Sequence, residues 1–266
     1  MPNMRSHPDL SIVIPAYNEE ARVGPTLRSY LDYCRDARRS VEVTVVDDGS
    51  LDGTSRVVDA LAGTYPELRL IRLADNRGKG YAVRTGIVNS RGNQILFADA
   101  DGATPIVELE RLEAAIAAGA DVAIGSRAAQ ASDVTVQARP LRRIMGRTFH
   151  RLVETLTVRG ILDTQCGFKL FRGPVAHALF SRMRMSGFSF DVEVLMMAQR
   201  QGYRIAEVPV NWTHQPGSKV NLVSDSARMA WDLFTIRRRY RRGEYNAPHL
   251  TPWTASPTET APASQP

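Results

Sequence analysis

The stretch Gln94-Ile-Leu-Phe-Ala-Asp-Ala-Asp-Gly102 ends an apolar run in two carboxylates that one small residue separates. Its apolar part predicts a buried strand, and Asp99 and Asp101 follow at the carboxyl end of that strand. Two ionised carboxylates this close repel each other unless a cation lies between them. A hard divalent cation such as Mg²⁺ or Mn²⁺ binds one or two carboxylates together with substrate phosphates. The stretch therefore indicates a site for a metal-chelated diphosphate; the alternative is a solvated Asp-Gly turn.

Short apolar runs alternate with helical patterns around this stretch. The expected strands are Ser11–Ala16, Val41–Val46, Leu68–Leu73, Gln94–Ala98 and Asp121–Ile124. The expected helices are Thr26–Ala37, Ser55–Leu61, Gly80–Asn89 and Pro105–Ala118. We expect Thr104 to cap the last of these helices, with Pro105 as its first residue. This alternation predicts an α/β, Rossmann-like fold, in which a mostly parallel sheet carries helices on both faces.

Polar residues gather where three of the expected strands end. Tyr17-Asn-Glu19 follows the first strand, Asp47-Asp-Gly-Ser50 the second, and Asp99-Ala-Asp101 the fourth. In open parallel sheets, ligands bind beyond the carboxyl ends of the strands. We therefore expect the three segments to meet at one cleft.

Bulk properties limit the class of protein. A chain of 266 residues suits one large domain with a substantial core. Two cysteines, Cys34 and Cys166, cannot build a disulfide framework, which favours a reducing compartment. We find neither a signal-peptide pattern nor an apolar run near the ~20 residues that span a bilayer. The expected location is therefore peripheral, on the cytoplasmic face of a membrane, and the alternative is a soluble protein.

The predicted domain organisation has four parts. These are an extension at 1–9, the main α/β domain at 10–225, a basic amphipathic helix at 226–245 and a disordered Pro-rich tail at 246–266.

The net charge of +6 favours anionic partners. Aromatic residues near the C-terminus lead into Arg237-Arg-Arg-Tyr-Arg-Arg242, a pattern typical of an interfacial helix attracted to anionic lipid. The alternative is a solvated basic face on an ordinary terminal helix. Because no nucleic-acid recognition element is recognisable, we expect no nucleic-acid partner.

Lysine is rare among the 34 basic residues: only Lys79, Lys169 and Lys219 occur, each in a Gly-containing segment. A lysine retained where arginine is the default suits phosphate through its compact charge. For Lys79, between two glycines, we weigh a phosphate contact against a plain turn lysine.

Read together, Ser11-Ile-Val-Ile-Pro-Ala-Tyr-Asn-Glu-Glu20, Val45-Val-Asp-Asp-Gly-Ser50 and Ala98-Asp-Ala-Asp-Gly102 resemble the family-2 glycosyltransferases of GT-A fold. Asp163-Thr-Gln-Cys-Gly-Phe-Lys-Leu-Phe171 and the later motifs look like polyprenyl-phosphate glycosyltransferases, most closely the dolichyl-phosphate β-glucosyltransferase branch. The later motifs are Phe190-Asp-Val-Glu193, Val208-Pro-Val-Asn-Trp212 and Pro216-Gly-Ser-Lys219. The resemblance covers residues 10–225 and implies a nucleotide-diphosphate sugar donor, Mg²⁺ or Mn²⁺, and a polyprenyl-phosphate acceptor.

Eight side chains are expected to bind the nucleotide sugar: Pro15, Tyr17, Glu19, Asp48, Lys79, Asp99, Gln165 and Lys219. The first three lie where the base and ribose would bind, and Asp48 would accept a hydrogen bond from the base. Asp99 and Asp101 would hold the metal ion, or one would hold it while the other grips sugar hydroxyls. No strong third ligand follows them, so diphosphate oxygens and water would complete the octahedron.

Three side chains are expected to act in catalysis: Asp101, Asp191 and Arg127. Arg127 would meet a phosphate, Asp191 would position the sugar, and Lys219 would close over the diphosphate and exclude water. Four arginines at a spacing of four share one helical face and suit the acceptor phosphate and the membrane: Arg139, Arg143, Arg147 and Arg151.

The expected reaction is in-line displacement with inversion, with UDP-glucose favoured over GDP-mannose as donor. A phosphate monoester is already a dianion for much of the time near neutral pH, because its second pKa is about 6, so it needs little help from a base. A hydroxyl acceptor, soluble or on a protein, would need Asp191 or Glu193 as base; otherwise these acids favour a helix N-terminus. A third alternative is an inactive membrane-docking scaffold with the same fold.

Overall fold

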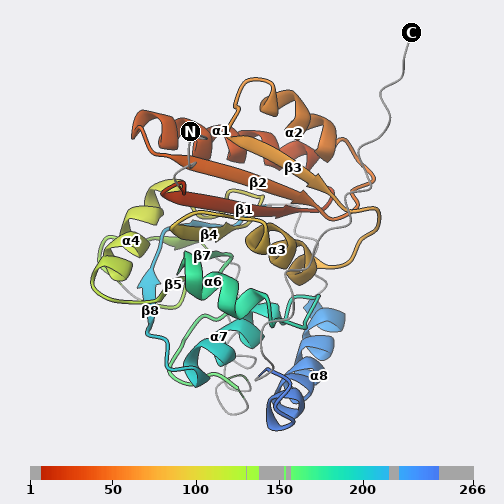
Figure 1. Ribbon diagram of the computed structural model, residues 1–266, viewed down its shortest axis with the longest axis vertical. Helices are drawn as coiled ribbons and strands as arrows, with labels where there is room; N and C mark the ends of the chain where they lie inside the picture. The colour runs from red at the N-terminus through yellow and green to blue at the C-terminus, as the bar shows by residue number, and fades with distance from the viewer. Residues whose placement is uncertain (1–6, 130, 138–152, 154–156, 216–221, 246–266) are drawn as a thin grey trace, which may run out of the picture.

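The computed structural model describes residues 7–129, 131–137, 153, 157–215 and 222–245 (Figure 1). Its centre is a seven-stranded sheet in the order β3-β2-β1-β4-β7-β5-β8. The strands are β1 (Leu10–Ala16), β2 (Val41–Asp47), β3 (Leu68–Arg72), β4 (Gln94–Ala98), β5 (Val122–Ser126), β7 (Phe168–Arg172) and β8 (Ile205–Pro209). All neighbouring pairs are parallel except the two that β7 makes, with β4 and with β5.

Helices cover both faces of this sheet, so the predicted fold class is confirmed. They are α1 (Glu20–Asp36), α2 (Thr54–Ala62), α3 (Lys79–Val88), α4 (Leu109–Ala117), α6 (Gly173–Phe180), α7 (Phe190–Arg200) and α8 (Leu222–Arg241). One core cluster holds buried side chains of α1, α2 and α4, and the other holds those of α3, α6, α7 and α8. Residues of β1 divide between the clusters by the two-residue period of a strand: Ile12 and Ile14 face the first, and Val13 the second.

Strand β7 is the main feature that the sequence analysis missed. It runs antiparallel between β4 and β5, with Ala98 opposite Phe168 and Ile124 opposite Lys169. Because it is reversed, its first residues lie at the sheet edge where β4 ends. The segment that precedes β7 therefore reaches the same edge as the acidic stretch.

Two helix starts were predicted wrongly. Helix α1 begins at Glu20, with Pro25 inside it, rather than at Thr26. Thr104 caps no helix: Pro105 is extended, a single 3₁₀ turn η1 (Ile106–Glu108) follows, and α4 begins only at Leu109. The carbonyl of Thr104 instead accepts a hydrogen bond from Tyr30 of α1, at 3.1 Å, which ties this loop to the first helix.

A small sheet lies beside the acidic edge. It pairs β6 (Val136–Gln137) with β9 (Trp212–Thr213). Thr213 donates its backbone N–H to the carbonyl of Ala103 at 2.9 Å. The segment after β9 is therefore held against the acidic stretch.

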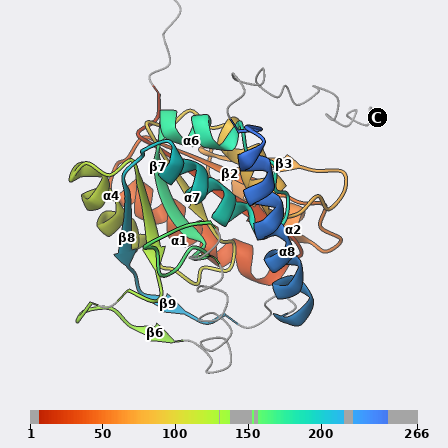
Figure 2. The same cartoon turned by 90° about the horizontal axis from the view of Figure 1, so that it is seen from below.

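Helix α8 lies beside α7 and crosses it at an angle (Figures 1 and 2). Its Leu233 and Ile236, and Tyr245 beyond it, belong to the second core cluster. The helix begins at Leu222, so the boundary predicted at residues 225 and 226 falls inside it. Within the described part of the chain, no helix is both long and apolar enough to cross a membrane.

Candidate active site

Three strand ends meet at one edge of the sheet, because β2, β1 and β4 are neighbours. Asn18 adopts a left-handed conformation (φ 53°) in the turn after β1 and binds the turn after β2 in both directions. Its N–H donates to the hydroxyl of Ser50 at 2.9 Å, and its side-chain oxygen accepts from the N–H of Leu51 at 2.8 Å. Asp47 accepts from the N–H of Ser50 at 2.9 Å and from the hydroxyl of Ser55. Hydrogen bonds thus connect the turns after β1 and β2 at the edge where the sequence predicts a cleft.

Asp48 is buried and binds the loop before α3. Its two carboxylate oxygens accept from the N–H groups of Arg77 and Gly78, both at 2.8 Å. Burial raises the pKa of Asp48, although these two hydrogen bonds oppose the rise. The observed role of Asp48 is to fix this loop. That its remaining lone pairs also accept a hydrogen bond from the base of the donor stays a prediction.

Asp99, directly after β4, contacts both a lysine and a glycine. Its carboxylate lies 2.7 Å from Nζ of Lys79, the first residue of α3. Its N–H donates to the carbonyl of Gly167 at 2.9 Å. A Cβ on Gly167 would lie 2.0 Å from a carboxylate oxygen of Asp99, so only glycine leaves that carboxylate room. Lys79 therefore lies beside the first of the two acidic residues, and its contact with a phosphate stays a prediction.

Asp101 faces the same edge, half-buried, and accepts from the N–H of Ala103 at 3.0 Å. Burial and the charge of Asp99 raise the pKa of Asp101, against the opposing effects of Ala103, Arg22 and Lys79. A divalent cation between the two carboxylates would relieve this repulsion, so the residues fit Mg²⁺ or Mn²⁺. In the described part of the chain no three His, Cys, Asp or Glu side chains form a metal cluster, so a cation here would need oxygens from a ligand or water.

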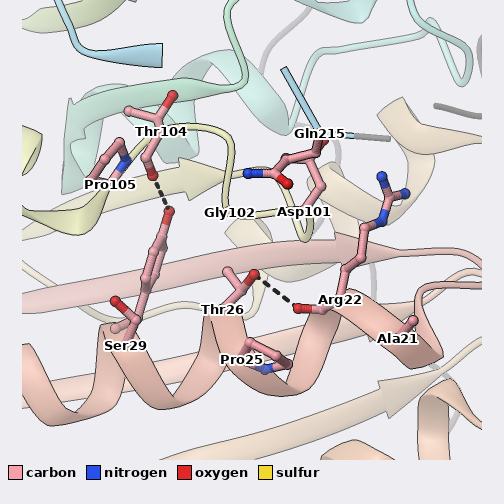
Figure 3. A pocket seen from close by; sticks show the side chains of 11 residues that line it. Ala21, Arg22, Pro25, Thr26, Ser29, Asp101, Gly102, Thr104, Pro105 and Gln215 are labelled. Atoms are coloured by element: carbon pink, nitrogen blue, oxygen red, sulfur yellow. Dashed lines mark hydrogen bonds between the residues drawn. The ribbon is translucent and has the colours of Figure 1, made fainter. Parts of the chain in front are cut away.

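A cavity of about 350 Å³ opens beside Asp101, between α1 and the loop that follows β4 (Figure 3). Arg22 of α1 and Gln215, which follows β9, lie with Asp101 at one end of it. Arg22 also forms a two-pronged ion pair with Glu19, at 2.6 Å from Nε and 2.5 Å from Nη2. The cavity therefore combines a carboxylate, a guanidinium and an amide, a set that suits a polar ligand such as a sugar or a phosphate.

A second lysine–carboxylate pair lies beneath the acidic stretch. Lys169 of β7 donates from Nζ to Asp191 and to the carbonyl of Cys166, both at 2.6 Å. The side chains of Lys169 and Asp191 are only 2% and 5% exposed. Burial raises the pKa of Asp191, and the charges of Lys169 and Lys79 oppose this. The charged side chain of Lys169 thus holds Asp191 in place.

Glu193, two residues further along α7, is fully buried and accepts hydrogen bonds from three donors. It accepts from the N–H groups of Arg184 and Met185, at 2.9 and 2.8 Å, and from the hydroxyl of Tyr245 at 2.7 Å. Both acids begin α7 as the sequence predicted. Through its hydrogen bond with Tyr245, Glu193 fixes the segment beyond α8 against α7.

Arg127 follows β5 and does not lie free to meet a phosphate. Its guanidinium grips both carboxylate oxygens of Asp163, at 2.7 and 2.8 Å, and its N–H adds a third bond at 3.0 Å. Burial would raise the pKa of Asp163, but Arg127 outweighs it and lowers that pKa to about 2. A catalytic role for Arg127 remains a prediction. It would require the guanidinium to bind a phosphate while it also binds Asp163.

The other predicted residues divide into two groups. Pro15 is buried in β1, Tyr17 and Glu19 are half-buried in the turn after it, and Gln165 donates to the sulfur of Met229 on α8 at 3.6 Å. Five residues lie outside the described part of the chain: Arg139, Arg143, Arg147, Arg151 and Lys219.

Three residues at this edge were not assigned from the sequence: Lys169, Gly167 and Asp163. All three belong to the Asp163–Phe171 motif that the resemblance singled out, and Lys169 also stood out as a rare lysine. What the sequence could not indicate is that a reversed strand delivers this motif to the end of β4.

The sheet order, with β7 reversed and with acidic residues at the ends of β2 and β4, is that of the GT-A fold of glycosyltransferases. Glucosyl-3-phosphoglycerate synthase from Mycobacterium tuberculosis, crystallised with Mn²⁺, UDP-glucose and phosphoglyceric acid, superposes with a TM-score of 0.63. That match has 18% sequence identity and covers 91% of this chain and 81% of that one, and it supports the fold.

The chain belongs to glycosyl transferase family 2, whose family model matches residues 11–180. A dolichyl-phosphate beta-glucosyltransferase of Dictyostelium discoideum is 40% identical over 246 residues, which cover 88% of this chain and 75% of that protein. The Homo sapiens protein of the same name is 42% identical over 249 residues, which cover 89% of this chain and 77% of the human protein. The resemblance drawn from the motifs is confirmed, and the chain is a glycosyltransferase.

Proposed function

We propose that this protein transfers glucose from UDP-glucose to a polyprenyl phosphate at a membrane surface, with inversion and with a divalent cation. The names of relatives at about 40% identity support the sugar and the lipid-phosphate acceptor. UDP-glucose and Mn²⁺ are bound in a structural neighbour, which supports this donor and this kind of cation.

The observation that carries the choice of acceptor is that neither candidate base is free. Glu193 is fully buried and accepts three hydrogen bonds. Asp191 is paired with Lys169 at 2.6 Å and almost completely buried. A hydroxyl acceptor would need such a base, whereas a phosphate acceptor carries its own negative charge. The geometry therefore favours a phosphate over a soluble or protein hydroxyl.

The donor would bind along the ends of β1, β2 and β4. Asp99 and Asp101 would hold Mg²⁺ or Mn²⁺, which supplies positive charge that stabilises the departing diphosphate. Lys79 lies beside Asp99 and adds a second positive charge at the same place. Asp48 holds the loop before α3, so that Lys79 is presented on a fixed backbone.

The test measures transfer of radiolabelled sugar from UDP-glucose, and separately from GDP-mannose, to polyprenyl phosphate in detergent. We expect label in the organic phase from UDP-glucose, and loss of about 10³-fold in Asp101→Ala, the scale of removing a main electrostatic contact. Asp36→Ala, at the exposed end of α1, is the matched control and keeps full activity. Manganese binding, followed by electron paramagnetic resonance, should weaken in Asp101→Ala alone.

Other outcomes would replace the proposal. Label from GDP-mannose alone would change the donor. Donor binding without any lipid product would transfer the assignment to a hydroxyl acceptor, and absence of donor binding would indicate an inactive scaffold.

A further inference from the structure

Helix α8 has two faces of opposite character. Met229, Leu233 and Ile236 point into the protein and are buried. The opposite face carries five side chains at spacings of three or four residues, which place them along one side of a helix: Arg228, Trp231, Phe234, Arg238 and Arg241. Trp231 is 74% exposed and Phe234 is 54% exposed. We call these five residues the outer face of α8.

The inner side of α8 is attached to the site by polar contacts as well. Ser189, just before α7, donates its hydroxyl to Asp232 at 2.7 Å. Tyr245, beyond the end of α8, donates to Glu193 of α7 at 2.7 Å. One contact within α8 and one just beyond its end therefore hold the helix against the start of α7, whose first turn carries Asp191. Any surface that binds the outer face is thereby placed at a fixed orientation to the active site.

None of the side chains that the structure describes balances the charge on the outer face with a carboxylate. Among the residues that the structure describes, no carboxylate lies within ion-pair distance of Arg228, Arg238 or Arg241. Two acids near this face whose side chains are described have other partners: Asp232 accepts from Ser189, and Glu244 lies 3.8 Å from Arg239. Two large aromatic side chains are thus exposed between exposed arginines.

We propose that the outer face of α8 docks on an anionic lipid surface. Trp231 and Phe234 would enter the headgroup region, where amphipathic and aromatic side chains are stable. The arginines on either side would contact lipid phosphates. A second copy of the chain is a poorer partner, because a two-fold contact through this face would bring its arginines against their own equivalents. The docking would serve the proposed lipid-phosphate acceptor, but it depends only on the face itself.

The test is co-sedimentation of the full chain with vesicles of phosphatidylcholine, with and without 30% phosphatidylglycerol, in the absence of donor and acceptor. We expect binding to the anionic vesicles, and a loss of at least tenfold in partitioning for Trp231→Ser/Phe234→Ser. Arg238→Gln/Arg241→Gln should lose the preference for anionic lipid and most of the salt dependence. Val107→Ser and Arg56→Gln, which change exposed residues on η1 and α2, are the matched controls and should bind normally.

The proposal is overturned if the wild-type chain ignores anionic vesicles, or if the aromatic variant binds them as well as wild type. It is also overturned if light scattering without vesicles shows a dimer that the aromatic variant abolishes.

Measurements of transferase activity separate this inference from the proposed function. On detergent-dispersed acceptor the aromatic variant should match wild type, and on vesicle-embedded acceptor it should fall at least tenfold. Wild-type vesicle binding without any transfer would leave the docking intact and remove the proposed function.

Discussion

Two lysine–carboxylate pairs flank one phenylalanine and differ mainly in their access to solvent. Nζ of Lys79 and Nζ of Lys169 lie 5.3 and 5.6 Å from the ring centre of Phe97. Each is within 2.7 Å of a carboxylate, Asp99 or Asp191. The first pair is 23% and 34% exposed, and the second 2% and 5%. We call them the open pair and the buried pair.

The difference shows how one kind of interaction serves two purposes. In the open pair, water or a ligand can replace either partner, so Lys79 and Asp99 can exchange contacts when a diphosphate and its cation arrive. In the buried pair no such replacement exists, and loss of one partner leaves a charge without compensation. The open pair is therefore suited to binding, and the buried pair to holding α7 against β7.

The largest expected effect comes from breaking the buried pair. Lys169→Met should lower the free energy of unfolding by about 3–5 kcal/mol, because Asp191 is left buried without its cation. Urea denaturation measures this, with Lys79→Met as the matched control, for which we expect a loss below about 1 kcal/mol. Adding Asp191→Leu to Lys169→Met should recover part of the loss. Equal losses in the two lysine variants would erase the distinction between the pairs.

The open pair should show the reverse pattern. Lys79→Ala should lower kcat/KM for UDP-glucose about 100-fold, equivalent to about 2.7 kcal/mol, because a positive charge beside the diphosphate is lost. Its unfolding transition should stay close to that of wild type. Calorimetric titration with UDP gives a readout that does not depend on turnover. Unchanged UDP binding together with unchanged kcat/KM would return Lys79 to the status of a plain turn lysine.

Breaking the pair of Arg127 and Asp163 should lower the free energy of unfolding by an amount between the losses expected for the open pair and the buried pair. Its guanidinium is partly exposed and its carboxylate is buried. Asp163→Asn should cost about 2 kcal/mol at pH 7, since each unit of pKa shift corresponds to about 1.4 kcal/mol. Because the pKa of Asp163 is lowered from 3.8 to about 2 in the folded protein, this stability is complete above pH 3.8. It is lost as the pH falls through about 2.

The measurement is urea denaturation of wild type and Asp163→Asn across this pH range, with Asp36→Asn as control. The gap between wild type and Asp163→Asn should narrow from pH 4 down to pH 2, in the window set by the two pKa values. A gap that stays constant across that window would show that the carboxylate contributes by its shape rather than by its charge.

The first half of the fold could be predicted because β1, β2 and β4 are largely buried runs with clear ends. Strand β4 occurs where the sequence placed it, and β1 and β2 begin or end within one residue. The start of α1 could not be predicted locally, because Pro25 usually marks a first helical turn and here lies inside the helix. Similarly, Thr104-Pro105 has the pattern of a helix start but binds Tyr30 instead.

The site could be predicted only as far as strand ends determine it. Asp99 and Asp101 follow β4, as the sequence indicated, and the structure adds that Lys79 lies beside Asp99. By contrast, β7 is a short run whose second residue is a lysine, and nothing local indicates its reversed direction or the burial of Lys169. Partners such as Asp163 for Arg127 are long-range, so they become visible only once the sheet order is known.

The missing side chain of Gly167 has a consequence for engineering. Only this residue leaves room for the carboxylate of Asp99, and it is held there by the pairing of β7 with β4. Deleting one residue within β7 would shift that pairing and bring a bulky neighbour, Phe168 or Cys166, against the acidic turn.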